Sequence, residues 1–303
     1  MDPENSLIQE IQALRKERNA IILAHNYQPG PIQDLADLTG DSLELSRKAQ
    51  ETDADVIVFC GVHFMAETAA ILNPDKIVLL PNPAAGCPMA DMITAQDVRR
   101  LRQEFPSVPI VTYVNSSAEV KAESTVCCTS ANVNRVVASF SDADTLYLIP
   151  DQNLAKYAAR HTQKTLHYWK GYCPVHHGLS ASMVLKAKAA HPDALFLAHP
   201  ECRPEVLDLA DVVTSTSGML RYVRNDAHNA FLIGTETGIL HPMRRDNPHK
   251  SFYPVSARMV CPDMKKTSLK DVLRSLKTLT PQVRVAEEIR LKALQAVERM
   301  LEI

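Results

Sequence analysis

The sequence lacks the features that would place the protein in a membrane, outside the cell or on nucleic acid. It contains no run approaching the roughly 18 apolar residues of a membrane span. Its 303 residues carry a formal net charge of −2, so no basic surface for nucleic acid or lipid headgroups is expected. The acidic, polar start at residues 1–5 does not resemble a secretory signal. We therefore expect a cytoplasmic protein with no nucleic-acid partner and no membrane partner.

Two cysteine patterns are also missing. Seven cysteines is an odd number, which does not suit a disulfide framework. No two cysteines show the Cys-x-x-Cys spacing that is typical of structural zinc sites. The thiols are therefore expected to stay reduced and to serve as buried groups, metal ligands or nucleophiles.

What the sequence does contain is an internal repeat. An apolar stretch followed at once by polar residues occurs three times, at 20–27, 110–115 and 195–201. A second apolar stretch follows in each copy, and each copy then reaches a Cys-Pro pair. The cysteines of these pairs are the only ones that precede a proline, and they are spaced by 86 and 88 residues: Cys87, Cys173 and Cys261. Short strand and helix patterns can agree by chance, but an ungapped block in register with three Cys-Pro pairs favours a true triplication.

Helical patterns alternate with these strands, which predicts parallel sheets covered on both faces. The expected fold is α/β, with three pseudo-threefold-related three-layer α/β/α domains and short parallel sheets. The expected boundaries are 1–86, 87–172 and 173–261, with 262–303 packing back on the first domain. Ser6 to Gln9 reads as a capping box at the start of the first helix. Further helices are predicted near residues 94–104, 180–190, 268–276 and 283–301.

The polar residues after the first strand of each copy are the main site candidates, because α/β sheets bind ligands at the carboxyl ends of their strands. Taken singly, each of these residues is more often a half-buried structural residue. Their equivalent placement in three copies favours a site suited to proton transfer and to oxygen-rich substrates: His25, Asn26, Tyr27, Tyr113, Asn115, His199 and Glu201.

Three hydroxyl residues precede helical stretches and read as N-caps: Ser42, Ser130 and Thr216. Capping alone would explain each of them. If the three helix starts converge, however, their free N–H groups would form a trap for a carboxylated or phosphorylated small molecule.

The three Cys-Pro cysteines suit a single metal centre to which each copy contributes one thiolate. Three lone cysteines favour a [4Fe–4S] cluster, one per chain, in which one iron has no protein ligand and can act as a Lewis acid. The alternative is three buried thiols that happen to align. The other four cysteines are taken as non-ligands: Cys60, Cys127, Cys128 and Cys202.

Ten stretches along nearly the whole chain resemble the quinolinate synthase family of NadA type. They are residues 24–28, 40–42, 61–68, 86–91, 113–119, 127–132, 169–177, 199–202, 235–238 and 261–265. The resemblance implies a transferase of de novo NAD biosynthesis that condenses iminoaspartate with dihydroxyacetone phosphate. Phosphate and two waters are lost as quinolinate forms. It also implies functional coupling to an L-aspartate oxidase or dehydrogenase that supplies iminoaspartate.

The family's functional residues can be carried over to matching positions of this chain. The resemblance implies a [4Fe–4S] cluster on Cys87, Cys173 and Cys261. The chemistry then suggests roles as hypotheses: Glu201 and Tyr27 move protons, while His25, Tyr113 and His199 orient substrate oxygens or donate protons. Four further residues are expected to hold phosphate and carboxylates: Ser42, Asn115, Ser130 and Thr216. The implied substrate-binding set is His25, Ser42, Tyr113, Val114, Asn115, Ser130, His199, Pro200, Glu201 and Thr216.

Other classes compete with this interpretation. Diphthamide-forming radical enzymes and hydroxymethylbutenyl diphosphate reductase also place one cysteine of each of three domains on a cluster. An oxygen-labile iron–sulfur sensor and a zinc-stabilised repeat scaffold are non-enzymatic alternatives. The chain also lacks the Cys-x-x-Cys-x-x-Cys run that some family members carry near the last ligand, so no redox switch of that kind is expected.

Overall fold

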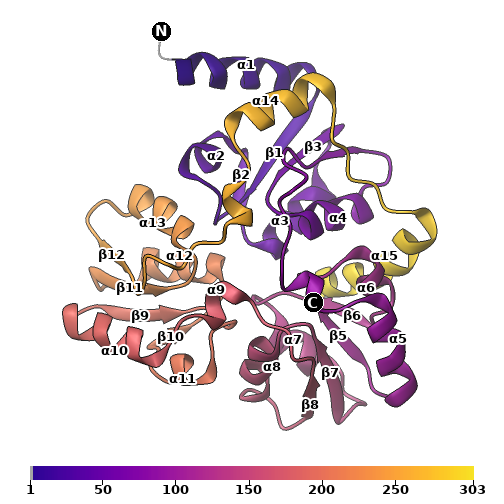
Figure 1. Ribbon diagram of the computed structural model, residues 1–303, viewed down its shortest axis with the longest axis vertical. Coiled ribbons are helices and arrows are strands. Elements are labelled where there is room, and N and C mark those ends of the chain that lie inside the picture. Colours follow the sequence, from indigo (N-terminus) through magenta and orange to yellow (C-terminus); the bar gives the residue numbers. More distant parts are fainter. Residues whose placement is uncertain (1–2) are drawn as a thin grey trace.

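The protein is described by a computed structural model that covers residues 3–303, and these residues form three four-stranded sheets. All pairings within the sheets are parallel, and the strand orders are β2-β1-β3-β4, β6-β5-β7-β8 and β10-β9-β11-β12. Because the three orders are the same, the α/β fold with three similar units is confirmed. Figure 1 shows them as three lobes around a common centre.

The strands follow the apolar stretches of the sequence. The first sheet contains β1 (Ala20–His25), β2 (Leu38–Gly40), β3 (Val56–Cys60) and β4 (Ile77–Leu79). The second contains β5 (Ile110–Tyr113), β6 (Val126–Cys128), β7 (Thr145–Ile149) and β8 (Thr165–Tyr168). The third contains β9 (Leu195–Ala198), β10 (Val212–Val213), β11 (Ala230–Gly234) and β12 (Ser251–Pro254). The inner strands are continuous apolar runs because helices cover both of their faces.

Helices alternate with the strands in the same order in each unit. Around the first sheet lie α1 (Pro3–Glu17), α2 (Gly30–Leu35), α3 (Ser42–Glu51) and α4 (His63–Leu72). Around the second lie α5 (Ala95–Glu104), α6 (Ala118–Ala122), α7 (Val133–Ala138) and α8 (Gln152–Ala159). The third has α9 (Pro174–His177), α10 (Ala181–Ala190), α11 (Pro204–Leu207), α12 (Thr216–Asn225) and α13 (Leu240–Asp246). No helix of residues 3–303 is long and apolar enough to span a bilayer.

Several predicted helix starts are confirmed and others are wrong. The helices predicted near residues 94, 180 and 268 begin there, and Thr94, Ser180 and Ser268 are their N-caps, each accepting a bond from the third helical N–H. The capping box at Ser6 is wrong, because α1 already begins at Pro3. The predicted start of the C-terminal helix at residue 283 is also wrong: the N–H of Val283 bonds to the Val78 carbonyl, and the helix begins four residues later.

The C-terminal extension is shared between two sheets rather than confined to the first. Its helix α14 (Leu269–Thr278) lies against α1 and β3, and Val272 and Leu276 join the apolar cluster of Ile11 and Ile22. Its helix α15 (Glu287–Glu302) instead packs against α4, α6 and β6. The extension therefore ties the first unit to the second. The exact domain boundaries stay a prediction.

The sheet registers show which residues of the three units are equivalent. At the carboxyl ends of the two central strands of each sheet, Ala24 pairs with Cys60, Thr112 with Ile149, and Ala198 with Gly234. Two residues beyond the second member of each pair stand Val62, Asp151 and Glu236. Two of the three units thus place a carboxylate where the first unit has an apolar side chain.

Candidate active site

A cavity lies where the carboxyl ends of the three sheets meet. It holds ≈ 690 Å³ of space not filled by atoms, its mouth included. Every unit contributes a residue from the end of its first strand: His25, Tyr113 and His199. All three side chains are buried. The convergence expected from the repeat is therefore present.

His25 and His199 are held in the same way in two different units. The Nδ1 atom of His25 accepts the backbone N–H of Tyr27 at 3.1 Å, and that of His199 accepts the N–H of Glu201 at 3.3 Å. An imidazole whose Nδ1 accepts carries its proton on Nε2. Burial lowers the pKa of each ring to about 3, so both are neutral at pH 7. The Nε2–H groups of His25 and His199 are therefore two neutral hydrogen-bond donors.

Glu201 is the centre of the polar contacts in the cavity. Its Oε2 lies 2.6 Å from Nδ1 of His176 and 3.6 Å from Nδ1 of His199. Tyr113 hydrogen-bonds both Glu201 and Ser130. Burial by itself would raise the pKa of Glu201, but the nearby histidines and the bonds from His176 and Tyr113 hold it well below its usual range. The buried side chain is therefore a carboxylate.

A chain of hydrogen bonds continues from Glu201 to Tyr27. The Nε2 atom of His176 lies 2.8 Å from Oγ1 of Thr235, and the same Oγ1 contacts the Tyr27 hydroxyl. Burial raises the pKa of Tyr27 well above its ordinary value, so the phenol keeps its proton. This row of neighbouring groups can pass a proton between the carboxylate and the phenol across two units.

The starts of α3 and α12 are fastened to each other beside the cavity. Asp41 is the N-cap of α3 and Ser215 that of α12, and the Ser215 hydroxyl donates to Oδ2 of Asp41 at 3.1 Å. Ser42 and Thr216 are therefore the first helical residues and not the caps, so the predicted role is shifted by one position. Ser130 is not a cap either, because Asn132 stands at the N-cap of α7. All three predicted hydroxyl residues nevertheless line the cavity.

Cys87, Cys173 and Cys261 line the same cavity, and each is half-buried. Burial raises the pKa of the Cys87 thiol to about 12 and raises the pKa of the other two as well. The three are close enough for the charge of Cys261 to act on Cys87 and that of Cys87 on Cys173. A cationic centre would convert such thiols to thiolates. Three convergent thiols from three units therefore fit an iron–sulfur cluster.

The loops that carry these cysteines are held by buried or half-buried carboxylates. Asp151 accepts the N–H of Cys173 at 3.2 Å, and Glu236 accepts that of Cys261 at 3.1 Å. The first unit has Val62 at the equivalent position, and its loop is held from the C-terminal extension, where Asp263 accepts the Gly86 N–H at 3.1 Å. Ligand loops are commonly fixed by such outer bonds.

The chain matches the family model described as "Quinolinate synthetase A protein" over residues 9–302. It is 55% identical over 300 residues to a quinolinate synthase of Geotalea uraniireducens, which covers 99% of this chain and 98% of the relative. It is 53% identical to one of Thermodesulfovibrio yellowstonii, with 98% of both chains covered. A "Quinolinate synthase 1" of Methanosarcina acetivorans is 51% identical, with 97% of both covered. This chain belongs to the quinolinate synthetase A family. Its relatives are named as enzymes.

Most residues that the family resemblance singled out meet in this one cavity. Those that line it are His25, Tyr27, Ser42, Tyr113, Asn115, Ser130, His199, Glu201 and Thr216. Val114 and Pro200 are buried beside it but are not among the residues that line it. Of the seven cysteines, all of which the structure describes, the three Cys-Pro cysteines line the cavity. Cys60, Cys127, Cys128 and Cys202 are buried elsewhere.

The sequence analysis missed four residues that contact the cavity-lining residues or the cysteine loops. They are Asp151, His176, Thr235 and Glu236. His176 stands three residues after Cys173, a Cys-x-x-His spacing that could have indicated a metal ligand or a partner of one. Asp151 and Glu236 could have been found by extending the repeat register past the second strand. Thr235 lies in the family-like stretch 235–238, directly after the second apolar stretch of the third copy.

Proposed function

We propose that this chain is a quinolinate synthase that acts in the biosynthesis of NAD, condensing iminoaspartate with dihydroxyacetone phosphate. Phosphate and two waters leave, and the pyridine ring of quinolinate closes. The observation that carries the proposal is the ionised, buried Glu201 in hydrogen-bond contact with His176 and Tyr113, in the cavity that the three Cys-Pro cysteines line. A carboxylate poised between proton donors suits the carbonyl isomerisation that this reaction needs.

The cavity offers donors for both anionic substrates. Ser42 and Thr216 are the first residues of α3 and α12, so their own backbone N–H groups have no partner within the helix. The N–H groups of Leu43, Glu44 and Gly218 are taken by the N-cap side chains. The phosphate and carboxylate oxygens are proposed to bind there, with Asn115 and Ser130 beside them. The Nε2–H groups of the neutral His25 and His199 would donate to further substrate oxygens.

We assign proton transfer to the hydrogen-bonded row that runs from Glu201 through His176 and Thr235 to Tyr27. The carboxylate takes a proton from the carbon next to the substrate carbonyl, and Tyr113 or a histidine N–H supplies one to the carbonyl oxygen. Thr235 links His176 to the phenol of Tyr27, so a proton can return through the row. Closure of the site by buried walls keeps these transfers out of bulk water.

A [4Fe–4S] cluster is proposed to be held by Cys87, Cys173 and Cys261. When bound, it supplies a Lewis-acidic iron without a protein ligand, which favours loss of hydroxide in a dehydration. The three thiols and the carboxylates behind them hold the group in place. The substrate-binding residues lie in the same cavity.

Two wider proposals follow from the same assignment. Iminoaspartate is a reactive imine, so an L-aspartate oxidase or dehydrogenase is proposed to supply it close to the time of use. The reaction is placed in the cytoplasm, because free thiols and an oxygen-sensitive cluster persist in a reducing compartment.

The decisive experiment measures quinolinate from both substrates with anaerobically purified protein. Glu201→Gln keeps the shape of the side chain and is expected to leave iron, sulfide and the visible spectrum unchanged while turnover falls at least about 100-fold. The control is Glu205→Gln, four residues on and exposed, which is expected to keep full activity. Normal turnover in Glu201→Gln would refute the role given to this residue.

A second set of variants tests the cluster ligands. Replacing Cys87, Cys173 or Cys261 singly by Ala is expected to abolish the full cluster, whereas Cys60→Ala, in the apolar core of the first unit, keeps it. Iron and sulfide analysis reads the result directly. A protein that contains zinc and no iron when prepared without oxygen, and that takes up no iron and sulfide after the zinc is removed, would overturn the proposal.

A further inference from the structure

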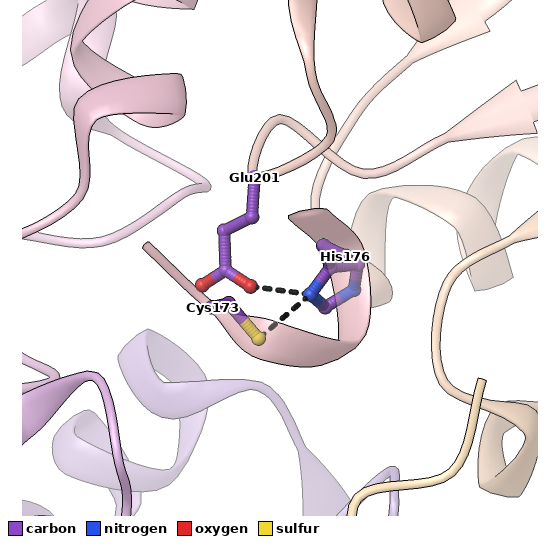
Figure 2. A group of neighbouring side chains, drawn as sticks. All are labelled: Cys173, His176 and Glu201. Carbon is purple, nitrogen blue, oxygen red and sulfur yellow. Dashed lines mark hydrogen bonds and ion pairs between the residues drawn. The ribbon is translucent and has the colours of Figure 1, made fainter. Parts of the chain in front are cut away.

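Cys173, His176 and Glu201 form a compact group of potential metal ligands within the larger cavity. One ligand atom from each lies within 4.8 Å of the others. Figure 2 shows the three side chains pointing toward one another, with Cys173 at the N-cap of α9, His176 within α9 and Glu201 on the loop after β9. The Nδ1 atom of His176 is the common point, at 3.2 Å from Sγ of Cys173 and 2.6 Å from Oε2 of Glu201.

We propose that these three residues form a mononuclear site for a zinc-like divalent ion in protein that carries no iron–sulfur cluster. One thiolate, one imidazole and one carboxylate are the ligand types that zinc takes in proteins, and three protein ligands leave a fourth position open. All three residues line the cavity. In a tetrahedral zinc site the ligand atoms stand roughly 3.4–3.6 Å apart, from the usual metal–ligand distances. The His176–Cys173 and His176–Glu201 separations need to change by less than about 1 Å to reach this arrangement.

The surroundings of His176 support the same assignment. A metal-bound histidine usually places its other ring nitrogen on a fixed partner, which sets the ring orientation. Here Nε2 lies 2.8 Å from Oγ1 of Thr235. The ring is therefore already oriented with Nδ1 toward the sulfur and the carboxylate. His176 and Glu201 are each at most 3% exposed, so little solvent competes for the ion.

The site and the cluster exclude each other, because both use Cys173. An ion bound here displaces the thiol proton to water and replaces the hydrogen bond between His176 and Glu201, and it occupies the carboxylate proposed to move protons. Zinc bound to cluster-free protein is therefore expected to block cluster assembly until it is removed. Cys87 and Cys261 are left free, which separates this site from one built on the three cysteines.

The test is an anaerobic titration of the full-length, cluster-free protein with Co²⁺, repeated with Zn²⁺ in competition. The wild type is expected to bind one ion, with thiolate-to-cobalt absorption of about one-third the strength of a three-thiolate site, since that absorption grows with the number of sulfurs. X-ray absorption at the zinc edge should count one sulfur and two or more nitrogen or oxygen neighbours.

Variants identify the ligands. Cys173→Ser and His176→Asn are expected to weaken binding at least tenfold, whereas the control variants Cys87→Ser and Cys261→Ser stay within about threefold of wild type. Thr235→Val, which leaves all three ligands in place, is expected to weaken binding about tenfold through the ring orientation.

If Cys87→Ser and Cys261→Ser weaken binding as much as Cys173→Ser, the ion sits on the three cysteines and the proposal is wrong. Absence of binding in the wild type would also overturn it. The readout is metal stoichiometry, so it succeeds or fails independently of quinolinate formation.

Discussion

Asp151 and Glu236 stand at equivalent positions of two units, and each accepts the backbone N–H of a cysteine that lines the cavity. Both side chains are buried. Burial and the nearby Glu201 raise the pKa of the Asp151 carboxyl well above its ordinary value, but either form of the group keeps an oxygen that accepts the N–H. Such a bond fixes the direction in which the cysteine side chain leaves the backbone. The two acids therefore serve as positioning residues for Cys173 and Cys261.

Glu236→Gln is expected to loosen the Cys261 loop. The amide keeps one oxygen, but the carboxylate uses both: one accepts from Cys261 and the other accepts from Gly238 at 2.7 Å. Outer-sphere changes of this kind commonly weaken metal binding 10- to 100-fold. The visible absorption of the cluster should decay at least tenfold faster with an iron chelator under anaerobic conditions. Val62→Ala, the equivalent position of the first unit, is the control and should decay at the wild-type rate. An unchanged rate in Glu236→Gln would contradict the positioning role.

Acid is expected to destabilise the cluster-free protein through His25 and His199. Their pKa values fall from 6.5 to about 3 on folding because the rings are buried. Between these values the unfolded chain binds more protons than the folded one, so stability rises with pH in that window. The contribution is fully present above pH 6.5 and is lost as the pH falls toward 3, with a slope approaching about 1.4 kcal/mol per pH unit for each ring.

Urea unfolding at several values between about pH 5 and 6.5 measures this slope, above the range in which an ordinary glutamate titrates. His25→Asn removes one titrating ring and should reduce the slope by up to half. His249→Asn changes an exposed ring and should leave it unchanged. Equal slopes in wild type and His25→Asn would show that the His25 ring is not buried neutral.

The contact between Asp41 and Ser215 is expected to couple the starts of α3 and α12. Replacing either N-cap by Ala should lower the free energy of unfolding by about 0.5–2 kcal/mol. Because the two caps also bond to each other at 3.1 Å, a double-mutant cycle should give a coupling of at least about 0.5 kcal/mol. Thr94→Ala, which removes the cap of α5, is the control partner and should add to Asp41→Ala without coupling. Full additivity of Asp41→Ala and Ser215→Ala would mean that the helix starts are held independently.

Thr235→Val is expected to break the hydrogen-bonded row between Glu201 and Tyr27 without changing the shape of the side chain at position 235. The variant keeps the volume of the side chain and removes the oxygen that links His176 to Tyr27. In the loaded enzyme kcat should fall about 10- to 100-fold while KM stays within about twofold, because substrate contacts are kept. Thr68→Val is the control: that threonine is also buried, but its hydroxyl bonds to Phe64 within its own helix. A larger change in KM than in kcat would assign Thr235 to binding instead.

The repeat made much of this architecture predictable. The offsets of the three Cys-Pro pairs led to three sheets, and the strand ends led to His25, Tyr113 and His199 in one cavity. Local signals were less reliable where tertiary contacts decide. Ser42 and Thr216 look like caps, yet Asp41 and Ser215 take that role because they also bond each other across two units. Ser6 was a reasonable cap, but the helix continues upstream of it to Pro3.

His176 and Thr235 were missed for a different reason. Their roles depend on contacts between α9, the loop after β11 and the loop after β9, which are far apart in the sequence. No periodicity marks such a meeting point, and the Cys-x-x-His spacing indicates a possible ligand without saying what it contacts. The packing of the C-terminal extension likewise depends on the tertiary structure of the first two units. The sequence alone therefore could not assign α14 and α15 to different sheets.

The bond between Asp263 and the Gly86 N–H joins the two ends of the threefold arrangement. Lys266 reinforces it by donating to the Ala84 carbonyl. The segment after the last Cys-Pro pair thus holds the loop that carries the first one. A chain cut just after Cys261 would keep all three thiols, all three sheets and the Asp41–Ser215 contact between the first and third units, but it would lose the bonds to the Cys87 loop. Its first cysteine loop would then be the one in which cluster loss begins.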